Sequence, residues 1–286
     1  MLFVSKIEGN TVCIKDTEDY IEERVSESLI RKVNGILGVE GDRVRVFTNE
    51  ELCSVYSMIV PLEIEGTTVK RCLDKNIKHI AIPYGVTHID DHAFRECLIL
   101  ESIKIPDSVI SIGNFAFSDC EKLKDIKISD SVTHIGASVF NYCMSLESIE
   151  IPKSIVSIGD WLFNGCHKLR SVVLPDSITY IPDYAFNVCG NLEDIEIPES
   201  VTAIGDAVFK NCYSLQSIKI PDSVTTIGAD VFMDCQSLES IEIPESVTSI
   251  GSRAFRRCKR LRNIKCKKDS YAEGYAKKEG YKVEYI

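Results

Sequence analysis

The amino-acid sequence predicts an α/β solenoid, preceded by a small α/β module. Eight cysteines recur at one constant 23-residue spacing from Cys97 to Cys258, with no insertion or deletion. Phenylalanines and leucines recur at the same interval, from Phe94 to Phe255 and from Leu100 to Leu261. Such a period is typical of one structural unit stacked on copies of itself. Stacking buries each column, and each large apolar side chain removed from water contributes roughly 1.5–3 kcal/mol.

Each repeat begins with a strand. Segments such as 238–243 (Leu-Glu-Ser-Ile-Glu-Ile) alternate apolar and polar residues and are rich in isoleucine, which favours a strand. A proline follows in most repeats, from Pro83 to Pro244, and its missing N–H ends the strand and starts a turn.

The second half of the repeat contains a shorter extended piece, Val-Thr-x-Ile, and then a glycine suited to a tight bend. Asp90 and Pro182 occupy the glycine position in two repeats, so a positive φ is not obligatory there. The next stretch, Ala-Phe-x-x-Cys, is expected to form one turn of helix.

The repeat resembles a known family. Leu238-x-x-Ile241-x-Ile243 resembles the strand of a leucine-rich repeat, and the full cycle, Ile-Pro-x-Ser-Val-Thr-x-Ile-Gly-x-x-Ala-Phe-x-x-Cys-x-x-Leu, is similar to the BspA-like bacterial class. The resemblance covers about residues 58–286, with serine where the general pattern has asparagine. It implies a right-handed coil with a parallel sheet on its concave face, roles in adhesion and protein binding at the cell surface, and no catalytic residues.

The cysteine column could form a disulfide ladder, because strands about 4.8 Å apart allow the Cα distances of disulfides. Stacked equivalents, however, point their Cβ atoms in the same direction, which fits a disulfide torsion poorly. Zinc would favour a Cys-x-x-Cys pair, and the sequence contains none. We therefore expect buried, reduced thiols that pack as small hydrophobic groups, and no metal or cofactor.

Neither the histidines nor the serines indicate catalysis. His88 and His134 lie two repeats apart, about 10 Å by strand spacing, which is too far to share an ion. The serine column from Ser108 to Ser246 recurs identically, whereas a nucleophile is needed once. We expect these hydroxyls to bond the local backbone at the turn.

The variable positions of the strand are the candidate binding residues. In a leucine-rich solenoid they point outward from the concave sheet, which is where such proteins usually bind. They mix both signs of charge and include no aromatic residue. An equally simple interpretation is a solvated sheet with cross-strand charge pairs. The candidates are Lys104, Lys127, Glu150, Arg170, Val173, Glu196, Lys219, Glu242, Arg262 and Lys265.

Charge is distributed unevenly along a chain whose net charge is −10. Residues 253–268 carry nine lysines and arginines and no acid. This basic end could bind an anionic polymer or nucleic acid, or align molecules head to tail. It could instead be the charged outer surface that a terminal repeat needs to stay soluble. Nucleic acid is the weaker expectation, because no aromatic residues are interleaved with the cations.

Both ends of the solenoid are expected to be capped. We predict a module at 1–57 and a solenoid at 58–286, divided into a cap at 58–76, repeats at 77–266 and a cap at 267–286. In the last cap, 270–273 (Ser-Tyr-Ala-Glu) is a capping box before a short helix that Gly280 ends, and Tyr271, Tyr275 and Tyr281 can cover the open core.

In the module, a hairpin is predicted around 8–10 (Glu-Gly-Asn), a helix at 26–37 and a strand at 43–47.

The leading hypothesis is a non-enzymatic binding or adhesion scaffold that presents its surface to a protein or glycan, as a monomer or with weak head-to-tail association. An enzyme acting through the module at 1–57 is the alternative.

No apolar run approaches the length of a membrane-spanning helix, so no membrane span is expected. The start of the chain lacks the pattern of a signal peptide, which favours the cytoplasm if the chain is complete, whereas the resemblance implies secretion or the cell surface.

Overall fold

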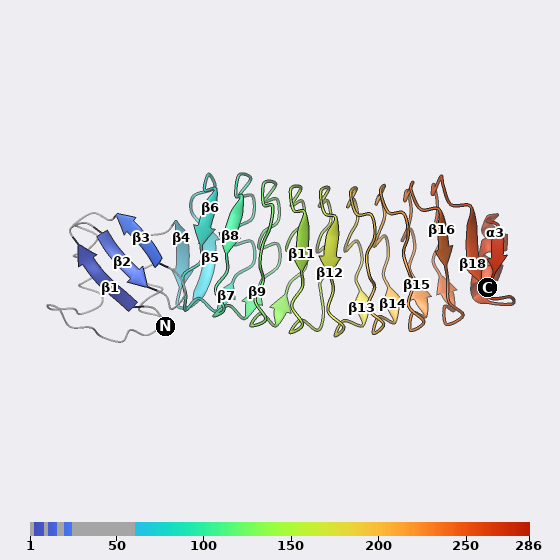
Figure 1. The fold of residues 1–286 in the computed structure, drawn as a ribbon, viewed down its shortest axis with the longest axis horizontal. Helices are drawn as coiled ribbons and strands as arrows, with labels where there is room; N and C mark the ends of the chain where they lie inside the picture. The colour runs from blue at the N-terminus through green and yellow to red at the C-terminus, as the bar shows by residue number, and fades with distance from the viewer. Residues whose placement is uncertain (1–2, 9–10, 16–19, 25–60) are drawn as a thin grey trace.

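The structure is a computed structural model that describes residues 3–8, 11–15, 20–24 and 61–286 (Figure 1). Stacked coils form a solenoid with two rows of parallel strands. Each strand pairs with the equivalent segment of a neighbouring repeat, so that Ile149 lies beside Val172 and Ile204 beside Ile227. The solenoid predicted from the repeat period and the parallel strands implied by the resemblance are thus confirmed.

The first row contains β6 (His79–Ala81), β8 (Ser102–Lys104), β11 (Ser148–Glu150), β12 (Ser171–Val173), β16 (Ser240–Glu242) and β18 (Asn263–Cys266). We call its outer surface the strand face. The second row contains β7 (His88–Ile89), β9 (Ser111–Ile112), β10 (His134–Ile135), β13 (Tyr180–Ile181), β14 (Ala203–Ile204), β15 (Thr226–Ile227) and β17 (Ser249–Ile250).

The core runs through the whole stack. The column phenylalanines from Phe94 to Phe255 are at most 1% exposed, and neighbouring rings stack with centroids 5.2–5.8 Å apart. The column cysteines are buried beside them. The core is therefore a ladder in which each coil covers its neighbour.

The Ala-Phe-x-x-Cys stretch is a series of turns, and the prediction of a helical turn was wrong. Alternate N–H groups bond the next coil, as for Phe94 to the Ala116 carbonyl at 2.7 Å, while those between them close local turns, as for Ala93 to Asp90 at 3.3 Å. In each coil the residues two before and two after the phenylalanine have positive φ, for example Trp161 and Gly165. A helix would use these N–H groups internally and lose the bonds between coils.

The glycine that follows the second-row segment in six of the coils permits a close approach between coils. Gly228 has no positive φ, and a Cβ built on it would lie 2.5 Å from backbone atoms of Gly205. The column glycines therefore let two coils touch.

The N-terminal end of the solenoid is a hairpin of β4 (Leu62–Glu65) and β5 (Thr68–Cys72). β5 pairs in parallel with β7, and Val69 lies beside Ile89. Val69 thus takes the position that isoleucine has in the second row of the following coils.

The C-terminal end has the predicted helix and strand, α3 (Tyr271–Glu279) and β19 (Val283–Tyr285). The Ser270 Oγ accepts from the Glu273 N–H, and Gly280 ends the helix with φ 81°. Tyr275 and Tyr281 pack edge-on against Phe255, each with centroids 6.1 Å apart. Tyr271 is 49% exposed and does not cover the core, contrary to expectation.

The N-terminal residues include the predicted hairpin, formed by β1 (Phe3–Glu8) and β2 (Thr11–Lys15). A third strand, β3 (Tyr20–Arg24), pairs with β2 and was not predicted. The helix expected at 26–37 and the strand expected at 43–47 lie outside the described residues, and the boundary at 57/58 stays a prediction. Within the described ranges, no helix is long and apolar enough to cross a membrane.

Candidate binding surface

The structure places the predicted site residues along the strand face. Lys104, Glu150, Val173, Glu242 and Lys265 lie in strands of the first row, each between two inward-pointing apolar residues. Lys127, Glu196 and Lys219 take the same place in coils without a regular strand there, and Arg170 and Arg262 lie just before the strand position. All are exposed except Lys265, which is half-buried.

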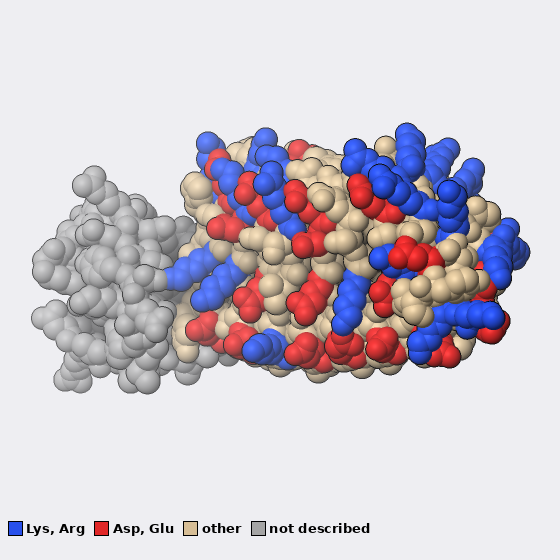
Figure 2. Space-filling model, turned by 45° about the vertical axis from the view of Figure 1, so that its right-hand side comes forward, with Lys and Arg blue, Asp and Glu red and all other residues tan. Residues whose placement is uncertain are grey.

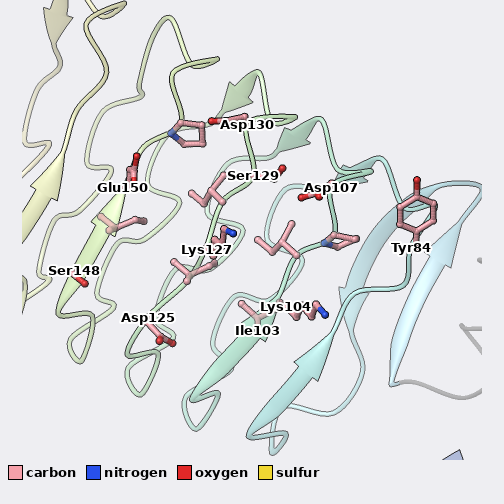
Figure 3. A pocket seen from close by; sticks show the side chains of 16 residues that line it. Tyr84, Ile103, Lys104, Asp107, Asp125, Lys127, Ser129, Asp130, Ser148 and Glu150 are labelled. Carbon is pink, nitrogen blue, oxygen red and sulfur yellow. The ribbon is translucent and has the colours of Figure 1, made fainter. Parts of the chain in front are cut away.

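A groove of about 1020 Å³ opens on this face across four successive coils, the first of which contributes Tyr84 (Figure 3). It brings together three of the ten predicted residues, Lys104, Lys127 and Glu150, and leaves the other seven outside. Sequence reasoning missed the other polar lining residues, Tyr84, Asp107, Asp125, Ser129, Asp130 and Ser148. The recurring acidic residue after the proline, as in Pro106-Asp107, is the signal that could have identified part of this set.

The strand ladder is interrupted at this groove. β8 pairs with β6, and β11 pairs with β12, while residues 125–128 between them form no strand. The N–H groups of Ile126, Lys127 and Ile128 donate to no backbone carbonyl of the described chain. Such groups must find water or another partner, so the groove offers backbone as well as side-chain contacts.

The groove is acidic. Its lining carries four carboxylates, those of Asp107, Asp125, Asp130 and Glu150, against the ammonium groups of Lys104 and Lys127. At its edge, Lys124 lies 3.4 Å from Glu101. A partner with more positive than negative groups would therefore be favoured electrostatically.

Elsewhere on the strand face two of the candidate lysines pair with acidic residues. Lys219 lies 2.8 Å from Glu199, which raises the pKa of the lysine through their hydrogen bond, and Lys265 lies 3.7 Å from Glu284. These exposed pairs contribute little to stability. They fit the solvated-sheet interpretation for this part of the face.

The cysteine column is structural. Each cysteine from Cys120 to Cys258 donates its thiol to the carbonyl of the phenylalanine 26 residues earlier, at 3.0–3.2 Å. Burial raises the pKa of Cys212 to about 12. The expectation that these thiols pack as buried hydrophobic groups is confirmed.

The hydroxyl groups of the serine column donate hydrogen bonds to backbone carbonyls of the preceding coil. Ser131 donates to the Val109 carbonyl at 2.8 Å and Ser223 to the Val201 carbonyl at 2.6 Å, each 22 residues earlier. The expected bond to the local backbone was wrong, although the structural role holds. In the described part of the chain, no three His, Cys, Asp or Glu side chains are grouped to hold a metal ion.

The last full coil is strongly basic (Figure 2, C-terminal end). Four of its nine cations pair with carboxylates, among them Arg253 with Asp230 at 3.0 Å and Arg257 with Asp234 at 3.5 Å. The five that form no ion pair within the described residues are Arg256, Lys259, Arg260, Arg262 and Lys268.

Stacked 23-residue coils, with repeated residues inside and variable residues outside, define a repeat scaffold. The chain belongs to the family described as BspA type Leucine rich repeat region, which matches residues 69–193 and 179–276 in six copies. The resemblance noted from the sequence is thus confirmed.

Solved structures of bacterial leucine-rich repeat proteins are similar to this chain. A leucine rich cell surface protein of Faecalibacterium prausnitzii is 29% identical over 69% of this chain and 71% of its own, with a TM-score of 0.53. A leucine-rich repeat protein of Bacteroides ovatus is 21% identical over 99% and 100%, with a TM-score of 0.46. The pneumococcal vaccine antigen PcpA is 23% identical over 66% and 60%, with a TM-score of 0.45. No curated protein matches the chain.

Proposed function

We propose that this protein is a non-enzymatic binding scaffold that recognises a protein or glycan through the groove of the strand face. The single observation that carries the proposal is the division of the repeat. The recurring side chains are buried between coils, whereas the variable ones face outward, and three of them line an open groove. Extended surfaces of this kind are the usual binding sites of solenoids.

We also propose that it acts at the cell surface. The support is its likeness to the cell surface protein of Faecalibacterium prausnitzii. A fractionation of the source cells, followed by immunoblotting with antibodies to the intact chain, tests this. Recovery only in the cytoplasmic fraction would contradict it.

Charge reversal in the groove tests the binding function. The intact chain is applied to arrays of extracellular-matrix proteins and of glycans, and the affinity for each hit is then measured with Asp107→Lys/Asp130→Lys, which reverses the charge of two groove carboxylates. We expect at least tenfold weaker binding, because the acidic groove favours cationic partners. Asp194→Lys/Asp222→Lys, which changes two exposed aspartates that do not line the groove, is the control and should bind like the wild type. If both variants bind the proteins or glycans found on the arrays with full affinity, the groove is not the binding site.

A second candidate function is the binding of an anionic polymer by the last coil. It is favoured by the five cations there that form no ion pair within the described residues. Elution of the intact chain from a heparin column tests it, because contacts to anionic groups weaken with salt. The variant Arg256→Glu/Lys259→Glu/Arg260→Glu should elute at much lower salt.

The matched control for this test spreads the same change of charge over other coils, with Lys122→Glu/Lys168→Glu/Lys210→Glu. It should elute close to the wild type. Equal shifts for the two triple variants would mean that only net charge matters, and that the last coil is simply a soluble end.

A further inference from the structure

A second surface feature lies in two successive coils, that of β11 and that of β12 and β13, in the turns that follow the second-row position (Figure 1). The rings of Trp161 and Tyr184 stack there, with centroids 4.0 Å apart and planes within 7°. Trp161, the only tryptophan of the chain, is 38% exposed, and the nearby Tyr180 of β13 is 44% exposed. Exposed aromatic residues are typical anchors of interfaces.

The ladder of rings is interrupted on one side of this stack. Trp161 lies two residues before its column phenylalanine, and the same place is taken by Phe115, Ser138 and Tyr184 in neighbouring coils, all with φ between 55° and 60°. Tyr184 stacks on one face of the indole. The next coil on the other side has Ser138, a small residue that is 5% exposed and carries no ring, while Trp161 keeps 38% of its surface exposed.

Three carboxylates accompany this stack. Asp160 directly precedes Trp161, Asp183 directly precedes Tyr184, and Asp206 takes the same place in the next coil. Coils about 4.8 Å apart place these side chains in a row. None of the three forms an ion pair with a lysine or arginine of the described chain, so their negative charge is uncompensated.

The carboxylates are held in place by the backbone. The Oδ1 of Asp160, Asp183 and Asp206 accepts an N–H from the next coil at 3.2, 2.8 and 2.7 Å. The Tyr180 hydroxyl also donates to the Asp183 Oδ1 at 3.2 Å. Burial, followed by the charge of Asp183, raises the pKa of Tyr180 to about 12. The second oxygen of each carboxylate makes no hydrogen bond within the described residues.

We propose that this aromatic–acidic ledge, formed by Trp161, Tyr184, Tyr180, Asp160, Asp183 and Asp206, binds an arginine-containing segment of a partner protein. A guanidinium group is flat and cationic, so it can lie against the exposed part of the Trp161 indole while its N–H groups donate to a carboxylate. The row of carboxylates complements further cations along the same segment. A neutral glycan would use the ring but would gain nothing from this uncompensated charge.

The lone tryptophan makes the proposal directly testable. Emission from Trp161 in the intact chain is followed during titration with a blocked peptide of four Gly-Arg repeats, and with a Gly-Gln peptide of the same length. We expect a saturable change with the arginine peptide that weakens as salt rises, and none with the glutamine peptide. A similar response to both peptides would overturn the proposal.

Two variants separate charge from ring contact without disturbing the fold. Asp160→Asn/Asp206→Asn keeps the oxygen that accepts the backbone N–H, since Asn114 already makes this bond to Ala137 at 2.8 Å in an equivalent position. We expect at least tenfold weaker binding. Ser138→Tyr places a ring beside the Trp161 indole, and the positive φ there is tolerated by the aromatic residues of neighbouring coils. It should lose the response as well.

Matched controls change the same properties elsewhere. Asp194→Asn/Asp222→Asn removes two exposed charges that lie outside both the ledge and the groove, and Ala207→Tyr adds a ring beyond Tyr184. Both variants should bind like the wild type. Full affinity in Ser138→Tyr or in Asp160→Asn/Asp206→Asn would refute the arginine site. A neutral oligosaccharide that changes Trp161 emission equally in the wild type and in the Asp→Asn variant would reassign the ledge to glycans.

Discussion

The inward and outward positions of each coil follow opposite rules. Phe163 stacks between Phe140 and Phe186 and is fully buried, as are its equivalents in every column coil. Glu150 and Val173 occupy equivalent outward places on neighbouring strands, although one is charged and the other apolar. Stacking fixes the inner residue because every coil must cover the same neighbour, while the outer residue is free to vary with function.

The largest effect is expected in thiol chemistry. Burial raises the pKa of the Cys212 and Cys258 thiols to about 12, from an ordinary value of 9.0. At pH 8 this lowers their thiolate fraction about a thousandfold, and the thiolate is the reactive form. In a protein with Cys13→Ser and Cys53→Ser, a thiol reagent should react slowly until urea is added. Rapid reaction of the folded protein would show that the thiols of the cysteine column are accessible to the reagent.

Truncating the aromatic ladder should cost the most stability. Phe163→Ala removes two ring stacks and leaves a cavity, and we expect the free energy of unfolding to fall by about 3–5 kcal/mol. Urea denaturation followed by circular dichroism measures this. Val156→Ala, at a position that is 66% exposed, is the control and should change stability by less than about 0.5 kcal/mol. Similar losses in both variants would contradict the division between inner and outer positions.

A smaller loss is expected where two coils touch. Gly228→Ala forces a Cβ against Gly205 and should lower stability by about 1–3 kcal/mol. Gly274→Ala in α3 meets nothing within 4 Å and should raise stability by up to about 1 kcal/mol, because alanine favours a helix. Thermal unfolding of the two variants checks the opposite signs. A stable Gly228→Ala would mean that the coils can move apart.

The C-terminal cap should make stability depend on pH. Hydrogen bonds from Lys277, Tyr285 and the Asp269 N–H lower the pKa of Glu273 to about 2, from an ordinary value of 4.5. Because the folded pKa lies below the unfolded one, the stabilisation is present above about pH 4.5 and is lost as the pH falls toward 2. Urea unfolding between pH 2 and pH 6 should show a weaker pH dependence in Glu273→Gln. Parallel curves for the variant and the wild type would show that Glu273 does not stabilise the cap.

The smallest stability effect is expected on the strand face. Lys127→Glu lies in the groove, and its free energy of unfolding should differ from the wild type by less than about 0.5 kcal/mol. Chemical denaturation measures this stability, and the affinity of the variant for the proteins or glycans found on the arrays is measured separately. A large loss of stability would show that the outward column also holds the coils together.

Sequence reasoning was most successful where one residue type repeats. The recurrence of phenylalanine and cysteine in the columns of Phe117 and Cys120 predicted stacked coils. Ser270 and Glu273 predicted the start of a helix, because a capping box depends only on residues close together in the sequence. It failed at Ala-Phe-x-x-Cys, where the short spacing resembles a helical turn but the N–H groups bond the next coil. It grouped ten candidate residues by column, whereas only Lys104, Lys127 and Glu150 line the groove.

The sequence by itself determined that 23-residue coils stack into a solenoid, which columns are buried and where the C-terminal cap forms. Only the tertiary structure decided that the ladder opens beside Lys127, that Trp161 and Tyr184 stack next to a gap at Ser138, and that glycine permits contact between coils. The physical reason is that these features depend on distances and hydrogen bonds between residues of different coils. A column in the sequence records which side chains recur, but not how closely neighbouring coils approach.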